Sequence, residues 1–351
     1  MNGVKKKEIG SVFHAAKFSP DDGLSLPEKA YYYGCGRYAI NALLQYHIDK
    51  KEWFRLFIPE YFCYDVIDSI KETGIQVVLY PDFPLADDLE VIKKIHFYPG
   101  DVLLRMNYFG WRTFRDNTNL NVVVIEDHSH ALDSEWAKRS NADWCFASLR
   151  KSIPIPDGGI LWSPKNYLSR ISEPEISAPH AKLSNQRFRG MELKSNYLES
   201  GDPFLKEEFL EIFNSTESET GKGEISAISA ISRKILKSIP SYLNQRKIEN
   251  VQFLLQHLTP NRCKVLQPDG QLSDFSLILF FDDTTCRDWV REELIKENIY
   301  PGILWEVRDD NISMRVKDFS RRMLSLPIDF RYSREDLLWM SKVVNSKMIQ
   351  L

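Results

Sequence analysis

Lys151 is the first of three groups of residues whose types and spacing could do chemistry. It follows an apolar run and precedes a turn rich in proline and glycine, residues 154–159. A lysine amine held out of water has a lowered pKa, and Schiff-base formation with an aldehyde requires such an amine. Taken alone, the segment favours the alternative, a surface lysine beside a loop.

The second group is the pentapeptide EDHSH, Glu126 to His130, which directly follows the apolar run 122–125. Ligands of open α/β sheets bind beyond the carboxyl ends of the strands, so Asp127 is placed to meet a cation or a protonated ring nitrogen. The alternative is a helix cap or a turn former. Because no third ligand pattern accompanies His128 and His130, we expect no metal site here.

The third group is the tetrapeptide GCGR, Gly34 to Arg37, which opens an expected helix. Glycines let the backbone approach an anion, and the free N–H groups of a helix N-terminus bind phosphate. Arg37 adds a charge-assisted contact. Such turns are common, so this group carries little weight without the other two.

Alternating apolar and polar runs predict the elements that position these groups. Strands are expected at 56–59, 76–80, 102–106, 122–125, 146–149 and 160–162, and helices at 38–48, 64–73 and 87–95. Strands that alternate with helices indicate an α/β architecture around a mostly parallel sheet.

The second half of the chain has a different pattern. Residues 204–258 are expected to be mainly helical, with an exposed polar loop at 215–224. A strand at 277–281 and helices at 286–297 and 334–347 predict a smaller α+β domain. We therefore divide the chain into a large domain, residues 1–244, and a small C-terminal domain, residues 245–351.

Composition excludes several classes of protein. The chain has 351 residues and a formal net charge of −3, which gives no reason to expect a nucleic acid or a membrane as partner. The basic run Lys5 to Lys7 is expected to be a solvated terminus. The sequence contains neither an apolar run long enough to span a membrane nor a secretory signal. Five scattered cysteines, with no C-x-x-C pair, predict a reduced, cytoplasmic chain.

In their order and spacing, the three groups together resemble the pyridoxal-phosphate enzymes with the aspartate-aminotransferase fold (fold type I), and more narrowly the DegT/StrS sugar aminotransferases. The resemblance rests on GCGRYAINALL at 34–44, on the spacing from Pro59 to Gly74, on Glu126 to His130, and on Lys151 seven residues before Gly158-Gly159. The segments ENIYPGILW and LSLPIDFRYSREDL extend it over most of the chain. It implies a mostly parallel, seven-stranded type of sheet flanked by helices.

The resemblance also implies roles for individual residues. Lys151 would hold pyridoxal 5′-phosphate as an internal aldimine and then move a proton between the substrate carbon and the cofactor. Asp127 would pair with the pyridinium nitrogen, and His130 would lie near the phenolic oxygen. Gly36 and Arg37 would bind the phosphate through their backbone N–H groups. One residue among Tyr61, Phe62 and Cys63 would cover the ring, and Phe62 is the preferred candidate.

Several positions depart from the family pattern. Phe146 stands where many members have a phosphate-binding serine, and Ser148 is the expected substitute. Arg37 replaces a common threonine. The Gly-Tyr-Asn-x-Arg stretch that reaches the partner subunit's site has no clear counterpart, and SNQRFRGMELKSNY occupies that region. The sequence therefore resembles a divergent branch.

The resemblance implies an aminotransferase that moves an amino group from an amino acid, glutamate or glutamine, to a keto sugar that is nucleotide-linked or free. Such reactions belong to the biosynthesis of cell-surface polysaccharides and related sugars. Lysine at position 151 favours transamination over dehydration, because related dehydratases carry histidine there. A homodimer is also implied. Arg331 and Arg321 are candidates for binding the donor's carboxylate, and a solvated or salt-bridged arginine is the alternative for each. The competing hypothesis is a cofactor-binding protein with a regulatory or assembly role.

Overall fold

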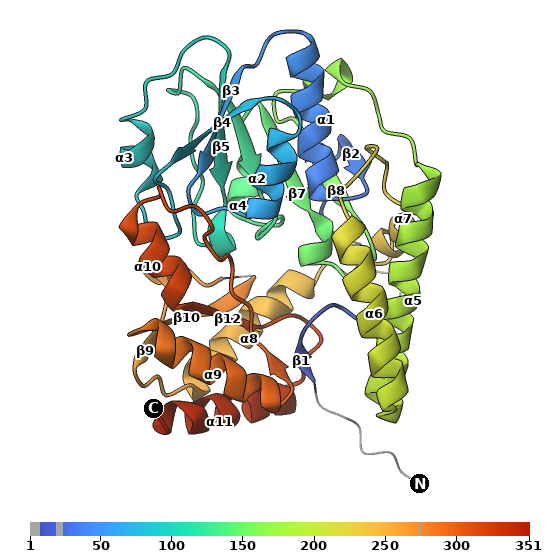
Figure 1. The fold of residues 1–351 in the computed structure, drawn as a ribbon, viewed down its shortest axis with the longest axis vertical. Coiled ribbons are helices and arrows are strands. Elements are labelled where there is room, and N and C mark those ends of the chain that lie inside the picture. The colour runs from blue at the N-terminus through green and yellow to red at the C-terminus, as the bar shows by residue number, and fades with distance from the viewer. Residues whose placement is uncertain (1–7, 19–23, 274) are drawn as a thin grey trace.

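The computed structural model describes residues 8–18, 24–273 and 275–351. The expected solvated terminus, Lys5 to Lys7, lies outside these residues. Figure 1 shows a large sheet with helices at the top of the view and a smaller sheet with helices below it. This arrangement confirms the predicted α/β fold class.

Seven strands form the large sheet within the described ranges. In spatial order they are β2 (Ala30–Tyr33), β8 (Gly159–Trp162), β7 (Trp144–Ser148), β6 (Val123–Asp127), β5 (Asp101–Met106), β3 (Arg55–Pro59) and β4 (Gln76–Tyr80). Neighbouring strands from β7 to β4 are parallel, whereas β8 is antiparallel to both β7 and β2. The carboxyl ends of β5, β6 and β7 therefore meet at one edge.

Helix α1 (Gly36–Asp49) packs its apolar side on this sheet. The residues predicted for that side, Ala39, Ile40, Leu43, Leu44 and His47, are all buried. Helices α1 and α2 (Tyr64–Lys71) lie on the same face of the sheet (Figure 1). Since α1 begins at the sheet edge where β7 ends, its N-terminus faces the turn that carries Lys151.

The smaller sheet contains β12 (Met323–Pro327), β10 (Ser276–Phe281) and β9 (Cys263–Val265), all antiparallel. The N-terminal strand β1 (Ile9–Gly10) pairs with β11 (Ile299–Tyr300) beside it. The predicted boundary after residue 244 falls near the start of α8 (Leu243–His257), and the division into two domains stays a prediction.

The remaining helices cover both sheets or extend beside them. They are α3 (Asp88–Ile92), α4 (Glu135–Arg139), α5 (Ala178–Ser200), α6 (Pro203–Glu219), α7 (Ala230–Leu236), α8 (Leu243–His257), α9 (Thr284–Lys296), α10 (Met314–Arg322) and α11 (Arg334–Ile349). Short 3₁₀ turns occur at Tyr108–Gly110, Leu149–Lys151, Leu168–Arg170 and Pro268–Gly270. Helices α5 and α6 form a long hairpin along one side of the molecule (Figure 1).

Two sequence-based boundaries are wrong. The expected loop at 215–224 begins only after Glu219, because α6 continues through the polar residues. The Thr216 hydroxyl bonds back to the Ile212 carbonyl, and arginines of other segments neutralise Glu217. The helix expected at 87–95 ends at Ile92, with Asp87 as its N-cap.

Candidate active site

Lys151 ends a 3₁₀ turn that follows strand β7. Its Nζ lies 5.1 Å from the centre of the Trp305 ring, close enough for a cation–π contact. Trp305 comes from the segment after β11, far along the chain. The half-buried lysine is therefore held between a strand end and an aromatic ring, and its role stays a prediction.

Asp127 is the last residue of β6 and is buried, with 5% of its surface exposed. Its Oδ1 accepts a hydrogen bond of 2.8 Å from the Ser129 backbone N–H. Burial raises the pKa of this carboxyl, and Lys151 and the Ser129 hydrogen bonds oppose that rise without cancelling it. Asp127 and Lys151 line the same cavity, so the two groups share one site.

The turn before α1 is closely packed against the turn after Lys151. A Cβ added to Gly159 would lie 2.3 Å from the Cys35 carbonyl carbon and 2.7 Å from the Gly36 nitrogen. Glycine is required at 159 for this approach. Cys35 is the N-cap of α1, and within the described part of the chain its side chain makes no capping hydrogen bond. The first N–H groups of α1 therefore keep their capacity to bind an anion.

A cavity of about 120 Å³ brings most of the predicted residues together. We call it the Lys151 cavity. Of the predicted site residues it is lined by Gly36, Arg37, Phe62, Asp127, Ser148 and Lys151. Its other lining residues are Cys35, Cys63, Asp65, Val66, Ser129, Phe146, Arg150, Glu217, Thr220 and Trp305.

His130 does not line the Lys151 cavity. Its ring stacks on Phe275 at 4.1 Å and on Trp305 at 5.2 Å, and its Nδ1 accepts a bond from the Phe109 backbone N–H. Burial, together with the charge of Lys151, lowers the pKa of this imidazole well below its usual value. His130 is thus a buried, neutral ring that stacks on Trp305.

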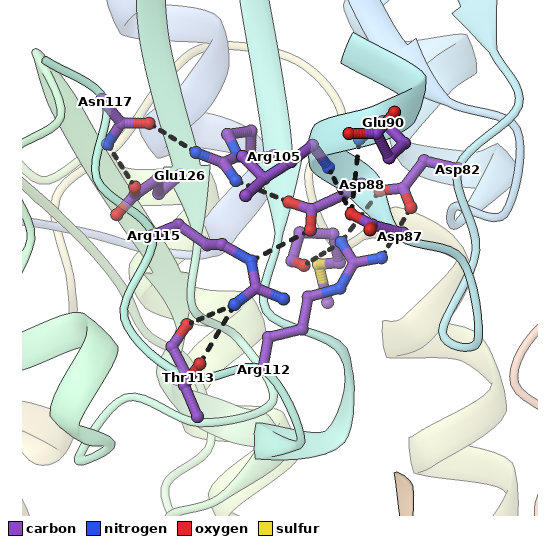
Figure 2. A network of polar contacts seen from close by, with 12 residues as sticks. Asp82, Asp87, Asp88, Glu90, Arg105, Arg112, Thr113, Arg115, Asn117 and Glu126 are labelled. Carbon is purple, nitrogen blue, oxygen red and sulfur yellow. Dashed lines mark hydrogen bonds and ion pairs between the residues drawn. The ribbon is translucent and has the colours of Figure 1, made fainter. Parts of the chain in front are cut away.

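Glu126 and Asp127 are adjacent in a strand, so their side chains point to opposite faces of the sheet. Figure 2 shows the buried network that receives Glu126. Its Oε1 accepts from Asn117 at 2.8 Å, Asn117 accepts from Arg105 of β5 at 2.6 Å, and Arg105 bonds to Asp88. The network ties the ends of β5 and β6 together and so holds the strand that carries Asp127.

Glu126, His128 and Cys145 are the one group in the described ranges whose ligand atoms lie close enough to hold a metal ion, within 4.8 Å of one another. The atoms already bond to protein groups. His128 Nε2 is 3.0 Å from Glu126 Oε2, and the same oxygen accepts from the Ser140 hydroxyl at 2.6 Å. Burial alone would raise the pKa of Glu126, but these hydrogen bonds lower it overall.

A second buried carboxylate, Asp157, holds the turn after Lys151. Its oxygens accept from the Ser184 hydroxyl at 2.8 Å, from the Ser229 N–H at 2.8 Å and hydroxyl at 2.6 Å, and from the Ser232 hydroxyl. His180 Nε2 lies 2.9 Å from Oδ2. Burial alone would raise the pKa of Asp157, but these bonds lower it overall. The cluster joins the Gly158-Gly159 turn to α5 and α7.

Sequence reasoning did not assign Trp305, Arg150 or Glu217 to the site. The segment that ends in Trp305 was recognised as similar to the family, which was a usable signal. Arg150 stands beside Lys151 in the sequence, and this adjacency was a second signal. Glu217 lies in a stretch expected to be a loop, so the sequence carried no signal for it.

Arg331, a candidate for binding a substrate carboxylate, is salt-bridged. Its guanidinium forms two bonds to Asp329, of 2.7 and 2.9 Å, and one of 3.2 Å to the Val12 carbonyl. It lines a cavity of about 180 Å³ that Lys151 also lines. Arg321 is exposed on α10.

A larger cavity, about 450 Å³, shares no lining residue with the Lys151 cavity, and its buried Lys194 pairs with Glu8 at 2.9 Å.

The Lys151 cavity fits pyridoxal phosphate. The buried Asp127 suits a protonated ring nitrogen, and Phe62 and Trp305 offer aromatic faces to a planar ring. The uncapped N-terminus of α1, beside Arg37, suits a phosphate. Lys151 supplies a primary amine in the same cavity.

No family model matches the sequence, and no curated protein sequence matches it. Several solved structures are similar in fold. PseC of Helicobacter pylori, an aminotransferase involved in the biosynthesis of pseudoaminic acid, has a TM-score of 0.65 and 14% identity, over 98% of this chain and all of PseC. DesV of S. venezuelae, solved in complex with a ketimine intermediate, has a TM-score of 0.58 and 16% identity, over 93% of this chain and 86% of DesV. DesI, solved in the presence of its TDP-sugar product, has a TM-score of 0.61 and 14% identity, over 92% of this chain and 81% of DesI.

At these identities the likeness establishes that this chain shares the fold of these structures. Among the described helices, none combines the length and apolar character needed to cross a membrane.

Proposed function

We propose that this protein is a pyridoxal-phosphate-dependent aminotransferase that transfers an amino group from an amino acid to a keto sugar. The observation that carries the proposal is the arrangement of Lys151 and Asp127 around one cavity that also contains the N-terminus of α1. An amine, a buried carboxylate and an anion site in one cavity match the aldehyde, ring nitrogen and phosphate of this cofactor.

When bound, pyridoxal phosphate supplies a carbonyl that takes up the amino group and a ring that withdraws electrons. Lys151 Nζ would take the proton from the substrate carbon that bears nitrogen and deliver it to the carbon that was the aldehyde of the cofactor. The Asp127 carboxylate holds the proton at the ring nitrogen. The N–H groups of Gly36 and Arg37 bind the phosphate, Phe62 and Trp305 exclude water, and Ser148 adds a hydroxyl to the phosphate end.

The sugar substrate is inferred from what the neighbours in fold act on. DesI was solved in the presence of its TDP-sugar product, and PseC is an aminotransferase involved in the biosynthesis of pseudoaminic acid. We infer a keto-sugar acceptor, nucleotide-linked in the first instance, with glutamate or glutamine as donor, in the biosynthesis of cell-surface polysaccharide or related sugars. The family resemblance to the DegT/StrS group, a homodimer and a cytoplasmic location belong to the same proposal.

The test compares wild-type protein with Lys151→Ala. Wild-type protein mixed with the cofactor is expected to develop the visible absorption band of a lysine-linked aldehyde, and Lys151→Ala is expected to lack it. Adding glutamate should shift the wild-type band to that of the amine form. Transaminase activity should fall by about 10²-fold or more without the lysine.

Two results would contradict the proposal. One is the absence of any band with wild-type protein, and the other is full activity of Lys151→Ala. A wild-type band that glutamate leaves unchanged would favour the competing hypothesis, a cofactor-binding protein with a regulatory or assembly role.

A further inference from the structure

Arg150 stands directly before Lys151, and its side chain lines the Lys151 cavity. Its guanidinium forms a two-pronged ion pair with Glu217 of α6, with Nη1–Oε2 and Nη2–Oε1 distances of 3.0 and 3.1 Å. Its Nε is buried and has no hydrogen-bond partner among the described residues. A planar guanidinium held on one edge by a carboxylate keeps its other donors in a fixed direction.

The carboxylate that holds Arg150 is shared with a second arginine. Arg187 of α5 reaches Glu217 Oε2 at 2.8 Å. Burial alone would raise the pKa of Glu217, but the two arginines lower it to about 2, so it is ionised at neutral pH. Burial and the nearby Arg150 lower the pKa of Arg187 to about 10, so it stays cationic.

Arg37, at the start of α1, adds a third guanidinium near the same place. A Cβ added to Gly221, just beyond α6, would lie 2.5 Å from Arg37 Nε, so this side chain packs on the end of α6. Arg37 and Arg150 both lower the pKa of the Cys35 thiol at the N-cap of α1, although burial raises it overall. Both arginines line the Lys151 cavity together with Gly36, the first residue of α1.

Arg37 and Arg150 are two cations that line the Lys151 cavity beside that N-terminus. A phosphate monoester carries close to two negative charges at neutral pH, and guanidinium groups pair with it through charge-assisted hydrogen bonds. The site lacks the serine expected five residues before the lysine. Phe146 occupies that position, and its side chain offers no hydrogen bond.

We propose that Arg150, positioned by Glu217, is the main side-chain anchor for the phosphate of the cofactor, and that the Ser148 hydroxyl adds a weaker contact. The inference rests on the proposed function, since it presumes a phosphate-bearing aldehyde in the Lys151 cavity. Its consequence is specificity, because Arg150 stabilises pyridoxal phosphate and contributes little to pyridoxal, which has a hydroxyl in place of the phosphate.

The test measures the affinities of pyridoxal phosphate and of pyridoxal by the absorbance change on linkage to Lys151. The readout is the ratio of the two affinities. Both ligands use the same lysine and ring pocket, so a general disturbance of the fold affects both and cancels in the ratio. Arg150→Met is expected to lower the ratio about 10-fold or more, the usual scale of a charge-assisted pair.

Arg189→Met is the matched control. Arg189 lies on α5 like Arg187, its side chain is 66% exposed, and it pairs with Glu208 away from the cavity. It is expected to leave the ratio unchanged. Should Arg150→Met not fold, Arg150→Gln gives the same measurement, because glutamine keeps a donor for Glu217 and removes the charge.

The outcomes separate the two proposals. Wild-type protein that binds neither aldehyde, or binds both equally, contradicts the proposed function. Wild-type protein that prefers the phosphorylated form, with an unchanged ratio in the Arg150 variants, overturns the role of Arg150 and leaves the proposed function intact. A ratio that falls in the Arg150 variants and not in Arg189→Met supports the inference.

Discussion

Replacing Asp157 by alanine is expected to destabilise the protein by about 3–5 kcal/mol. The carboxylate is 2% exposed and receives hydrogen bonds from the hydroxyls of three serines and the Ser229 N–H, and it pairs with His180. Removing one partner of a buried charged network leaves the other groups desolvated and unpaired, which costs this amount. The effect is at the upper end for single substitutions.

The measurement is thermal unfolding followed by circular dichroism, with cofactor-free protein. At about 2 °C per kcal/mol for a long chain, Asp157→Ala is expected to lower the Tm by roughly 6–10 °C. Asp310→Ala is the control, because Asp310 is exposed, and it should change the Tm by about 1 °C at most. A Tm for Asp157→Ala within 2 °C of wild type would refute the reasoning.

The pH dependence of a second variant at this position, Asp157→Asn, gives another check. The pKa of Asp157 is lowered from 3.8 in the folded protein, so its stabilisation is complete above pH 3.8 and is lost as the pH falls through the folded pKa. The Tm difference between wild type and Asp157→Asn should therefore shrink below pH 3.8. A difference that stays constant down to pH 2 would contradict the assignment of the pKa direction.

Further substitutions probe the rest of the site. Gly159→Ala places a Cβ 2.3 Å from the Cys35 backbone and should weaken cofactor affinity, whereas equal affinity by absorbance titration would contradict the close approach. Glu217→Gln removes a carboxyl whose pKa is lowered from 4.5 to about 2 in the folded protein. The wild-type Tm should therefore fall more steeply than the Tm of the variant between pH 4.5 and 2. Parallel curves of Tm against pH would contradict this. Asp127→Asn keeps the shape of the side chain but cannot hold the ring proton as an ion pair. Its kcat for amine transfer should drop about 10-fold or more with the cofactor still bound, and an unchanged kcat would remove Asp127 from the mechanism.

Local sequence patterns were sufficient to predict a helix or strand where one of its faces is apolar and the other is not. The strand Gln76–Tyr80 and the buried side of α1 were predicted correctly, because an apolar run or stripe must pack against the core. Helix α5 shows the limit of this approach. Its buried side includes Ser184, Arg187 and Lys194, so it lacks an apolar stripe that a sequence pattern could reveal.

The sequence by itself determined the candidate chemistry of Lys151 and Asp127. Asp127 ends β6 and Lys151 follows β7, which are neighbouring parallel strands, and the carboxyl ends of such strands meet at one edge of the sheet. Only the tertiary structure decided what surrounds them. Glu217 pairs with Arg150, which lies 67 residues earlier in the chain. Trp305, in the segment that follows β11, contacts Lys151. Such contacts depend on how separate elements pack, and no local pattern of residues encodes the distance between them.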